Sequence, residues 1–571
     1  MGRRTGRPGA AELHAVTAVA AAAPDRARFA RVRAWLEARP RAADALLLGA
    51  VTAVSALLRL VRLGAIPYGV HSDEAQVGTD AHRILHDGWI GVYTHAALGQ
   101  PTGHAYLTTP SIWALGDTAF ALRLPLALVA LAAVPLLYLL VRTSFGRTEA
   151  TFAALMLAFS YWHLFYSRVA HWSISYGTVL LAVLLCLALA LRTLRWWWFV
   201  AGGALLGLGV YTYNIYPVAV LAAYVFIAVM SLRIVLRARR TAAEVVPDDA
   251  LPEPRPWLRG VALFTLAALV VALPMINYLR NPDAYYWKHF DNYGDVRVTR
   301  TPEYREADFA GKVRLIAAQA KFFASAYAWH GRKDIVDANG LRPVFDPLTL
   351  ALIGGGLFFA WRYRRNPVVI AAVVCFVILP LPAVLQRGSI MRQPVAAAPY
   401  AMLLAALPLA ALWRAPSHGR GGVRFATAGA AAFAVAVVAG VTVHDYFWTL
   451  RKDPFVREIY FSQMTTASTY IRHLPPGTYV YFYDERASIN LETRQFLAPD
   501  AKGEDRSREF SPYDASIEGI DRSRPVSFVL MGAYTPLIDA IAMRYPGGAE
   551  RIAMRDGKLE FVAYELPARG G

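Results

Sequence analysis

Cysteine is nearly absent from this chain of 571 residues, and acidic residues are outnumbered by basic ones. Only Cys186 and Cys375 occur, both inside apolar runs, so the sequence predicts no disulfide framework and does not indicate a redox compartment. Asp and Glu number 41 against 59 Lys and Arg, which gives a formal net charge of +18. The basic residues cluster between apolar runs, and this pattern indicates membrane topology and contact with anionic lipids rather than nucleic-acid binding.

Several motifs of known chemistry are also missing from the sequence. It contains no glycine-rich phosphate loop, no zinc-ligand spacing and no nucleophile elbow. Apart from His82 and His86, which are four residues apart, the histidines have no spacing typical of metal ligands. We therefore assign no metal and no cofactor, and a divalent ion stays an alternative that no ligand spacing supports.

Long apolar runs dominate the sequence instead. The chain is 56% hydrophobic, with a mean hydropathy of +0.34. Since a membrane-spanning helix needs roughly 20 largely apolar residues, the pattern predicts a polytopic α-helical membrane protein with about eleven spans. We expect them at 43–62, 122–141, 149–166, 175–191, 197–213, 215–232, 260–279, 346–361, 367–385, 394–413 and 425–444.

The distribution of Lys and Arg between these runs predicts the orientation. Residues 1–42 form a basic tail, and the short connections on the same side as this tail are far richer in arginine than those on the other side. The positive-inside rule therefore predicts a multi-pass protein of the cell membrane with a cytoplasmic N-terminus. The transmembrane domain is expected over 43–445, with outer regions at 63–121 and 280–345.

We expect helices within both outer regions. The apolar segment 104–116 is too short to cross a bilayer and is typical of an interfacial helix, and a second helix is expected near 78–88. In the later region, apolar residues recur at helical spacing over about 307–329.

Residues 446–571 have the composition of a soluble domain, which we expect outside the cytoplasm. The segments 479–483, 526–531 and 559–564 resemble strands, and 455–473 and 535–544 resemble helices. The sequence therefore predicts a C-terminal extracytoplasmic α/β domain.

An adjacent acidic pair, Asp73 and Glu74, follows the first apolar run. A carboxylate within hydrogen-bond reach of a hydroxyl can take its proton as the oxygen attacks an electrophile. We predict that Asp73 is such a base and that Glu74 orients it or the acceptor. The alternative is that Ser72 and Asp73 cap the following helix, with acidic groups at its positive end.

Cationic side chains occur at the end of the second outer region and in the short outer connection between the expected spans at 367–385 and 394–413, where they could bind an anionic head group. The candidates for phosphate binding are Arg387, Arg392, Lys333 and Arg332, and His330, just before the last two in sequence, is a possible substrate contact. The alternative is that Arg387 and Arg392 only anchor their flanking spans at the interface.

Polar and aromatic side chains offer further contacts to a substrate. His171 lies in the connection that follows the span at 149–166, and Tyr211 and Tyr213 lie at an outer span end. For the two tyrosines the alternative is an aromatic belt at the membrane surface.

Six stretches, in this order, resemble the GT-C superfamily of membrane glycosyltransferases, and in particular the bacterial relatives of protein O-mannosyltransferases of the family-39 type. They are RLGAIPYGVHSDEAQVG at 62–78, ALRLPLALVALAAVPLLYLLVRTSFGR at 121–147, FSYWHLFYSRVAHWS at 159–173, GLGVYTYNIYP at 207–217, WHGRKD at 329–334 and DPLTLALIGGGL at 346–357. The first-loop aspartate of this superfamily matches Asp73. Many relatives have an acidic residue after the Ser-Arg element, where this chain has His171, so we assign no second carboxylate.

The resemblance implies a polyprenyl-phosphate sugar as donor, an acceptor outside the cytoplasm (protein, lipid or glycan) and inversion by direct displacement. One alternative function is a transporter or lipid flippase, which would place ionisable groups within its spans, where this chain has almost none. A second alternative is a non-catalytic envelope assembly protein that binds through residues 446–571.

Overall fold

The computed structural model describes the chain over residues 39–95, 99–241, 251–292, 297–329, 342–386, 391–415, 421–507 and 516–569. Most of the expected N-terminal tail and residues 330–341 of the second outer region fall outside these ranges.

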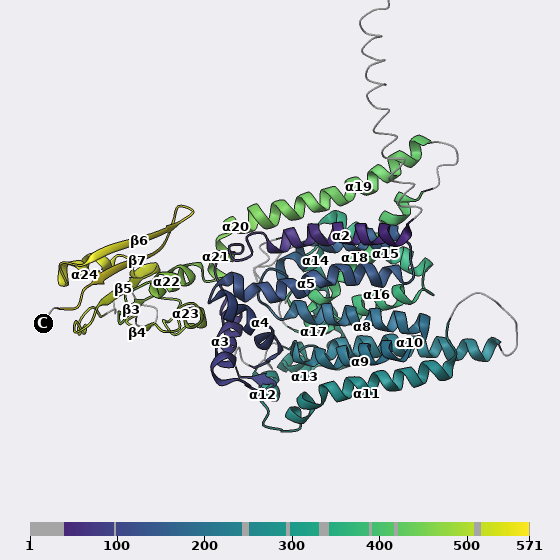
Figure 1. The fold of residues 1–571 in the computed structure, drawn as a ribbon, viewed down its shortest axis with the longest axis horizontal. Helices are drawn as coiled ribbons and strands as arrows, with labels where there is room; N and C mark the ends of the chain where they lie inside the picture. The colour runs from purple at the N-terminus through teal and green to yellow at the C-terminus, as the bar shows by residue number, and fades with distance from the viewer. Residues whose placement is uncertain are drawn as a thin grey trace, which may run out of the picture.

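A bundle of long apolar helices forms the body of the molecule, and most of them run side by side (Figure 1). Within the described ranges, eight helical segments are long and apolar enough to cross a membrane. They are α2 (Pro40–Leu60), α5 (Ala119–Arg142), α8 (Ser173–Thr193), α10 (Pro217–Thr241), α11 (Pro254–Leu279), α16 with α17 (Pro367–Ile378 and Leu381–Val384), η5 with α18 (Gln393–Ala397 and Ala398–Trp413), and α19 with η6 and α20 (Gly421–His444, Asp445–Thr449 and Leu450–Lys452). Two shorter apolar helices, α9 (Trp196–Leu208, continued by η2 at Gly209–Tyr211) and α15 (Pro347–Arg362), accompany them.

The expected span at 149–166 is not one helix. It divides into α6 (Arg147–Ala158) and α7 (Tyr161–Tyr166). Ser160 breaks the run because its side chain accepts a hydrogen bond from the His163 backbone N–H and so caps a new helix. Every residue of α7 is buried, so the apolar composition that suggested a span here reflects burial within the protein.

The first outer region lies at one end of the bundle (Figure 1). Its helices are α3 (Ser72–Asp87) and α4 (Gly103–Leu115), which pack together, and two short strands pair between them, β1 (Tyr93–Thr94) and β2 (Gln100–Pro101). The segment 104–116 is thus helical, as expected, and it packs beside α3. The helix expected at 78–88 begins earlier, at Ser72.

Three short elements and a longer helix lie in the described part of the second outer region. They are α12 (Tyr285–Asn292), η4 (Val298–Arg300), α13 (Pro302–Glu306) and α14 (Phe309–Ala328). Helix α14 confirms the amphipathic helix expected at 307–329.

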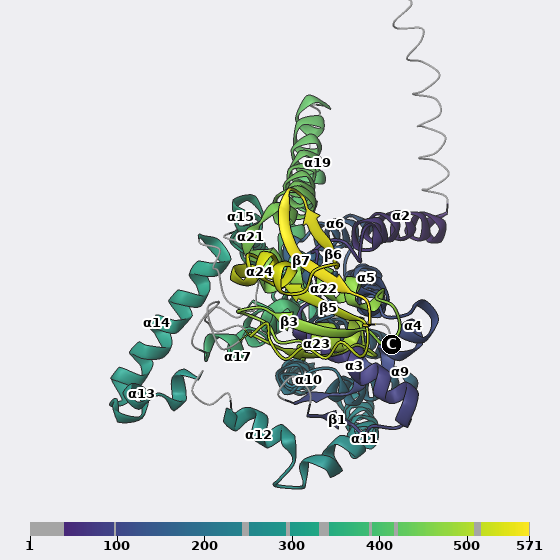
Figure 2. The ribbon, with the colours of Figure 1, turned by 90° about the vertical axis from the view of Figure 1, so that its left-hand side faces the viewer.

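The C-terminal domain is built on one mixed sheet of order β4-β3-β5-β7-β6 (Figure 2). Its strands are β3 (Tyr479–Tyr483), β4 (Lys502–Asp505), β5 (Val526–Leu530), β6 (Ala549–Arg555) and β7 (Lys558–Leu566), of which β4, β3 and β5 are parallel. Its helical segments are α21 (Pro454–Ile459), α22 (Ser462–Arg472), α23 (Glu492–Leu497), η8 (Gly532–Tyr534) and α24 (Leu537–Arg544). The three expected strands are present, whereas β4 and β6 were not expected.

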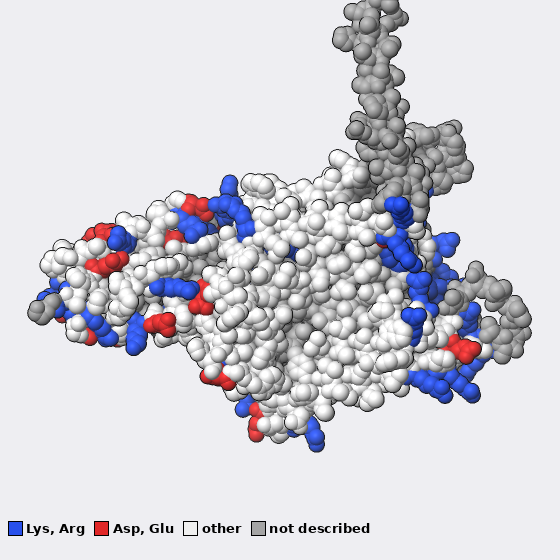
Figure 3. All heavy atoms as spheres, in the orientation of Figure 1, with Lys and Arg blue, Asp and Glu red and all other residues white. Residues whose placement is uncertain are grey.

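Charged side chains avoid the middle of the helical body. Figure 3 shows Lys and Arg gathered at the end of the bundle opposite the C-terminal domain, with an almost uncharged surface between that end and the domain. A surface of this kind fits the hydrocarbon of a bilayer.

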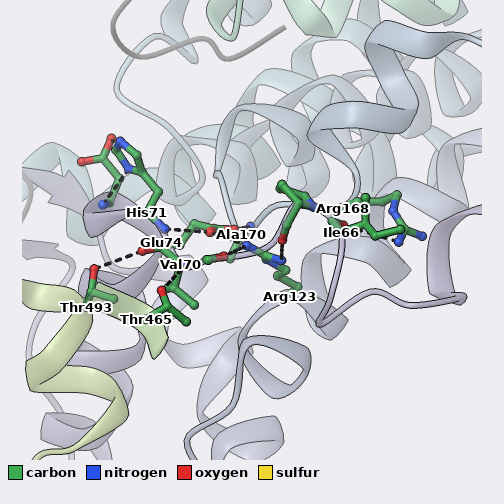
Figure 4. A network of polar contacts seen from close by, with 12 residues as sticks. Ile66, Val70, His71, Glu74, Arg123, Arg168, Ala170, Thr465 and Thr493 are labelled. Atoms are coloured by element: carbon green, nitrogen blue, oxygen red, sulfur yellow. Dashed lines mark hydrogen bonds and ion pairs between the residues drawn. The ribbon is translucent and has the colours of Figure 1, made fainter. Parts of the chain in front are cut away.

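The C-terminal domain holds the segment just before α3 (Figure 4). The Val70 backbone N–H donates to Thr465 Oγ1 (2.9 Å), and Thr493 Oγ1 donates to the Val70 carbonyl (3.0 Å). Gly69 has a φ of +102°, and a Cβ atom there would lie 2.0 Å from the Tyr460 carbonyl oxygen. The domain is therefore in direct backbone contact with the chain leading to Asp73.

Candidate functional site

Asp73 lies in the first turn of α3, and its side chain does not cap that helix. The cap is His71, whose Nδ1 accepts a hydrogen bond from the Asp73 backbone N–H (3.0 Å). The Glu74 carboxylate in turn accepts one from the His71 backbone N–H (3.1 Å), which completes a capping box. The cap is thus His71 and not Ser72 or Asp73, whereas Asp73 and Glu74 do lie in the first turn, at the positive end of the helix, as that alternative also expected.

The Asp73 carboxylate faces a cation from far along the chain. Arg392 Nη1 lies 3.3 Å from Asp73 Oδ2. Their side chains are 16% and 27% exposed, so both are accessible to a ligand while being partly shielded from water. Of the four predicted phosphate-binding residues, Arg392 is thus the one that the described structure brings to Asp73.

Two buried side chains fix the backbone on either side of Arg392. Trp162 Nε1 donates to the Met391 carbonyl (3.0 Å), and the Tyr176 hydroxyl donates to the Gln393 carbonyl. Next to Tyr176, Gly177 lets α8 approach η5 closely, since a Cβ atom there would lie 2.7 Å from Cα of Ala396. The backbone that carries Arg392 is therefore held by a buried hydrogen bond on each side.

Glu74 has a different environment from its neighbour (Figure 4). Its carboxylate pairs with Arg123 Nε (3.0 Å) and Nη2 (2.9 Å) in a bidentate arrangement, and it also accepts the Ala170 backbone N–H (2.6 Å). The side chains of Glu74 and Arg123 are 3% and 0% exposed. Glu74 was expected to orient either Asp73 or the acceptor. A carboxylate this deeply buried is out of reach of an acceptor, so orientation of the turn that carries Asp73 is the role that fits.

Two buried arginines organise the chain between α2 and α3. Arg123 donates to the carbonyls of Leu63, Pro67 and Gly69. Arg168 donates to the carbonyls of Leu58 and Val61, and its guanidinium lies 5.1 Å from the ring centroid of Tyr446.

From the sequence, neither of these two arginines was assigned a role. An arginine at the end of an apolar run could have been recognised as needing a buried partner.

His171 lies near the Asp73–Arg392 pair. The Ser173 backbone N–H donates to His171 Nδ1 (3.2 Å), which assigns the ring proton to Nε2. That buried Nε2 has no hydrogen-bond partner among the described residues. Burial, together with the positive charge of Arg392, holds the pKa of His171 well below its ordinary value. A neutral imidazole with a donor to offer can bind a ligand oxygen.

The two candidate tyrosines lie in different surroundings, and only Tyr213 is beside His171. The ring of Tyr213 lies 5.9 Å from that of His171, so it flanks the same region. Tyr211 instead donates its hydroxyl to the Val271 carbonyl of α11 (2.9 Å), which ties it to the helical body.

Arg387, His330, Arg332 and Lys333 fall outside the described residues. Within the described ranges, no group of three or more His, Cys, Asp or Glu side chains is arranged to hold a metal ion. His82, one of the two histidines with helical spacing, lies 2.6 Å from Asp117. The site as described is thus one carboxylate, one guanidinium and a neutral histidine.

Comparison with known proteins gives two kinds of match. The sequence model of the family described as dolichyl-phosphate-mannose-protein mannosyltransferase matches residues 99–244. ArnT from Cupriavidus metallidurans in the apo state has a similar structure, with a TM-score of 0.52, 15% identity, and coverage of 91% of this chain and 97% of ArnT. For ArnT bound to undecaprenyl phosphate the TM-score is 0.51, again at 15% identity, with coverage of 90% and 97%. No curated protein matches the sequence.

Proposed function

We propose that the chain, which has the fold of ArnT, is a membrane glycosyltransferase that transfers a sugar from a polyprenyl phosphate to a hydroxyl group of an acceptor outside the cytoplasm. The observation that carries this proposal is the pairing of Asp73 with Arg392. A base and a phosphate-binding cation are the two groups that such a transfer requires. The complex of ArnT with undecaprenyl phosphate supports the assignment of the donor class.

Asp73 is the general base of the proposed reaction. The acceptor oxygen forms a bond to the anomeric carbon, and the bond from that carbon to the phosphate oxygen breaks, so the anomeric centre is inverted. The acceptor proton passes to Asp73, and the bonding electron pair leaves with the polyprenyl phosphate. A positioned base of this kind contributes roughly 100- to 10,000-fold to a rate.

Arg392 has two successive partners in this mechanism. In the structure it pairs with Asp73, whereas in the reaction it neutralises the leaving phosphate. The donor is a phosphodiester with one negative charge, like a carboxylate, and a second negative charge develops on the phosphate as the bond to the sugar breaks. Arg392 therefore interacts more strongly with the phosphate as the reaction proceeds, and this leaves the Asp73 carboxylate available to the acceptor proton. His171 Nε2, which is buried and unpartnered among the described residues, donates to an oxygen of the bound sugar or phosphate.

We further propose that the N-terminus is cytoplasmic and that the site and the C-terminal domain lie outside. The clustering of Lys and Arg at the opposite end of the bundle supports this orientation (Figure 3). The donor phosphate would then meet Arg392 at the outer leaflet, with its prenyl chain in the bilayer.

Product analysis tests the proposal. The purified chain in bilayer nanodiscs is incubated with a panel of prenyl-phosphate sugars and an envelope extract, and the products are identified by mass spectrometry. We expect one donor to give free prenyl phosphate and a glycosylated acceptor with inverted configuration. If no donor is consumed faster by the wild-type chain than by the Asp73→Asn variant, the proposed function is wrong.

A further inference from the structure

A concave surface lies at the seam between the helical body and the C-terminal domain. It has a volume of about 720 Å³ and is formed by the ends of α2 and α19, η6, α20 and the turn between β6 and β7. Its apolar side chains include Leu57, Val61 and Trp448, which are 62%, 43% and 58% exposed. We call this surface the seam groove.

The polar end of the seam groove carries an excess of positive charge, and Figure 3 shows Lys and Arg at this seam. The charged residues that line it are Arg62, Arg451, Lys452, Arg457, Lys558 and Asp556. Asp556 is shared between Arg451 (3.2 Å) and Arg457 (3.8 Å).

Behind this end, the buried Glu560 pairs with Arg457. In the described part of the chain, the other three cations, Arg62, Lys452 and Lys558, have no carboxylate within 4.0 Å. The groove thus retains three uncompensated positive charges above an apolar wall.

Buried side chains separate the seam groove from Asp73. Arg168 lies behind its wall and donates to the carbonyls of Leu58 and Val61, both of which line the groove. Tyr446 is fully buried behind the same wall, and its hydroxyl donates to the carbonyl of Ile66, which also lines the groove. Beyond them comes the buried pair of Glu74 and Arg123. The groove is therefore not the place where the sugar reacts.

We propose that the seam groove binds an anionic glycerophospholipid as an accessory ligand. Exposed apolar side chains near the outer ends of α2 and α19 fit acyl chains, and the three uncompensated cations fit one phosphodiester group. The bound lipid would bridge α2, α20 and the β6–β7 turn, and so fasten the C-terminal domain to the helical body. This domain holds the backbone at Val70, three residues before Asp73.

Trp448 offers a direct probe of the groove, because brominated acyl chains quench a tryptophan that they touch. The full chain is placed in phosphatidylcholine nanodiscs that contain a small fraction of dibrominated phosphatidylglycerol or dibrominated phosphatidylcholine. The Trp448 contribution is obtained by difference from the Trp448→Phe variant. At about a fivefold gain per cation, three cations predict a preference for phosphatidylglycerol on the order of 100-fold. Equal quenching by the two lipids would overturn the proposal.

A charge-matched pair of variants distinguishes this site from general attraction of anionic lipid. The triple change Arg62→Gln, Lys452→Gln and Lys558→Gln should abolish the preference at Trp448. The control is the triple change Arg305→Gln, Arg314→Gln and Lys321→Gln, in exposed cations of α13 and α14, and it should keep the preference.

The donor lipid is the competing occupant of the seam groove. Two results together would place the groove on the path of the donor and overturn the accessory-lipid proposal. The first is displacement of phosphatidylglycerol by an equimolar polyprenyl phosphate, and the second is a raised KM for the donor in the triple groove variant. The Asp73→Asn variant should bind phosphatidylglycerol as the wild type does, so the result does not depend on the proposed reaction.

Discussion

Arg392 follows Asp73 by 319 residues in sequence, yet its Nη1 atom lies 3.3 Å from Asp73 Oδ2. The first residue lies in the opening turn of α3, and the second lies just before η5. Each is held by its own buried supports, namely Glu74 with Arg123 on one side and Trp162 with Tyr176 on the other. The two elements are thus positioned independently, and the pair forms where they meet.

Replacing Arg392 should weaken the use of the donor. A hydrogen bond between charged groups contributes about 1.5–3 kcal/mol, so Arg392→Gln should lower kcat/KM for the prenyl-phosphate sugar by about 10- to 100-fold. Steady-state kinetics against donor concentration would measure this. Arg392→Lys should recover part of the loss, since the charge remains but the bidentate geometry does not. Unchanged kinetics in both variants would remove Arg392 from the phosphate site.

Glu74→Gln should act first on stability. The neutral amide leaves the buried Arg123 charge without its carboxylate, and breaking a buried pair in this way costs about 3–5 kcal/mol. Thermal unfolding in detergent would detect the change. The control is Glu458→Gln, whose pair with Arg486 is about half exposed and should contribute no more than about 1 kcal/mol. If the two variants unfold at the same temperature, the Glu74–Arg123 pair does not support the fold.

The contacts of Val70 with the C-terminal domain should be needed for activity. Thr465→Val together with Thr493→Val removes both hydrogen bonds at nearly constant volume and leaves the buried Val70 amide and carbonyl unpaired. We expect faster hydrogen exchange over 63–71 and slower transfer. Thr478→Val, which removes an exposed bond to the Pro475 carbonyl, is the matched control and should change neither. If hydrogen exchange over 63–71 is as slow in the double variant as in the wild type, these contacts do not hold the segment.

His104 should make the protein sensitive to acid. Burial lowers the pKa of this histidine to about 3, from an unfolded value near 6.5. Because the folded pKa is the lower one, the stabilisation is complete above pH 6.5 and is lost as the pH falls toward 3. His104→Gln, which can keep the bond to Ser175, should therefore flatten the decline of the unfolding temperature between pH 6.5 and 4. Parallel declines in the two proteins would show that His104 does not titrate in this range.

Hydrophobic pattern was enough to predict most of the helical body, and the amphipathic period predicted α14. It failed at 149–166, because apolar composition does not distinguish a helix in lipid from buried residues such as those of α7. The edge strand β6 was missed because its side chains are mostly exposed and its sequence lacks an apolar pattern.

The site was predictable only in part. Asp73 was found because a carboxylate at the end of an apolar run is unusual, and Arg392 was found because it lies in a short outer connection. The buried role of Glu74 was not predictable, since it depends on Arg123, which the fold brings from α5. His71 as a helix cap was also missed, because the usual cap residues, Ser72 and Asp73, follow it directly.

The turnover of the Asp73→Asn variant at saturating donor tests the account most directly. The amide keeps the size of the carboxylate but cannot take the acceptor proton, so we predict a loss of at least about 100-fold in kcat with unchanged membrane insertion and unfolding temperature. A variant that transfers sugar at the wild-type rate would contradict the assignment of Asp73 as the base.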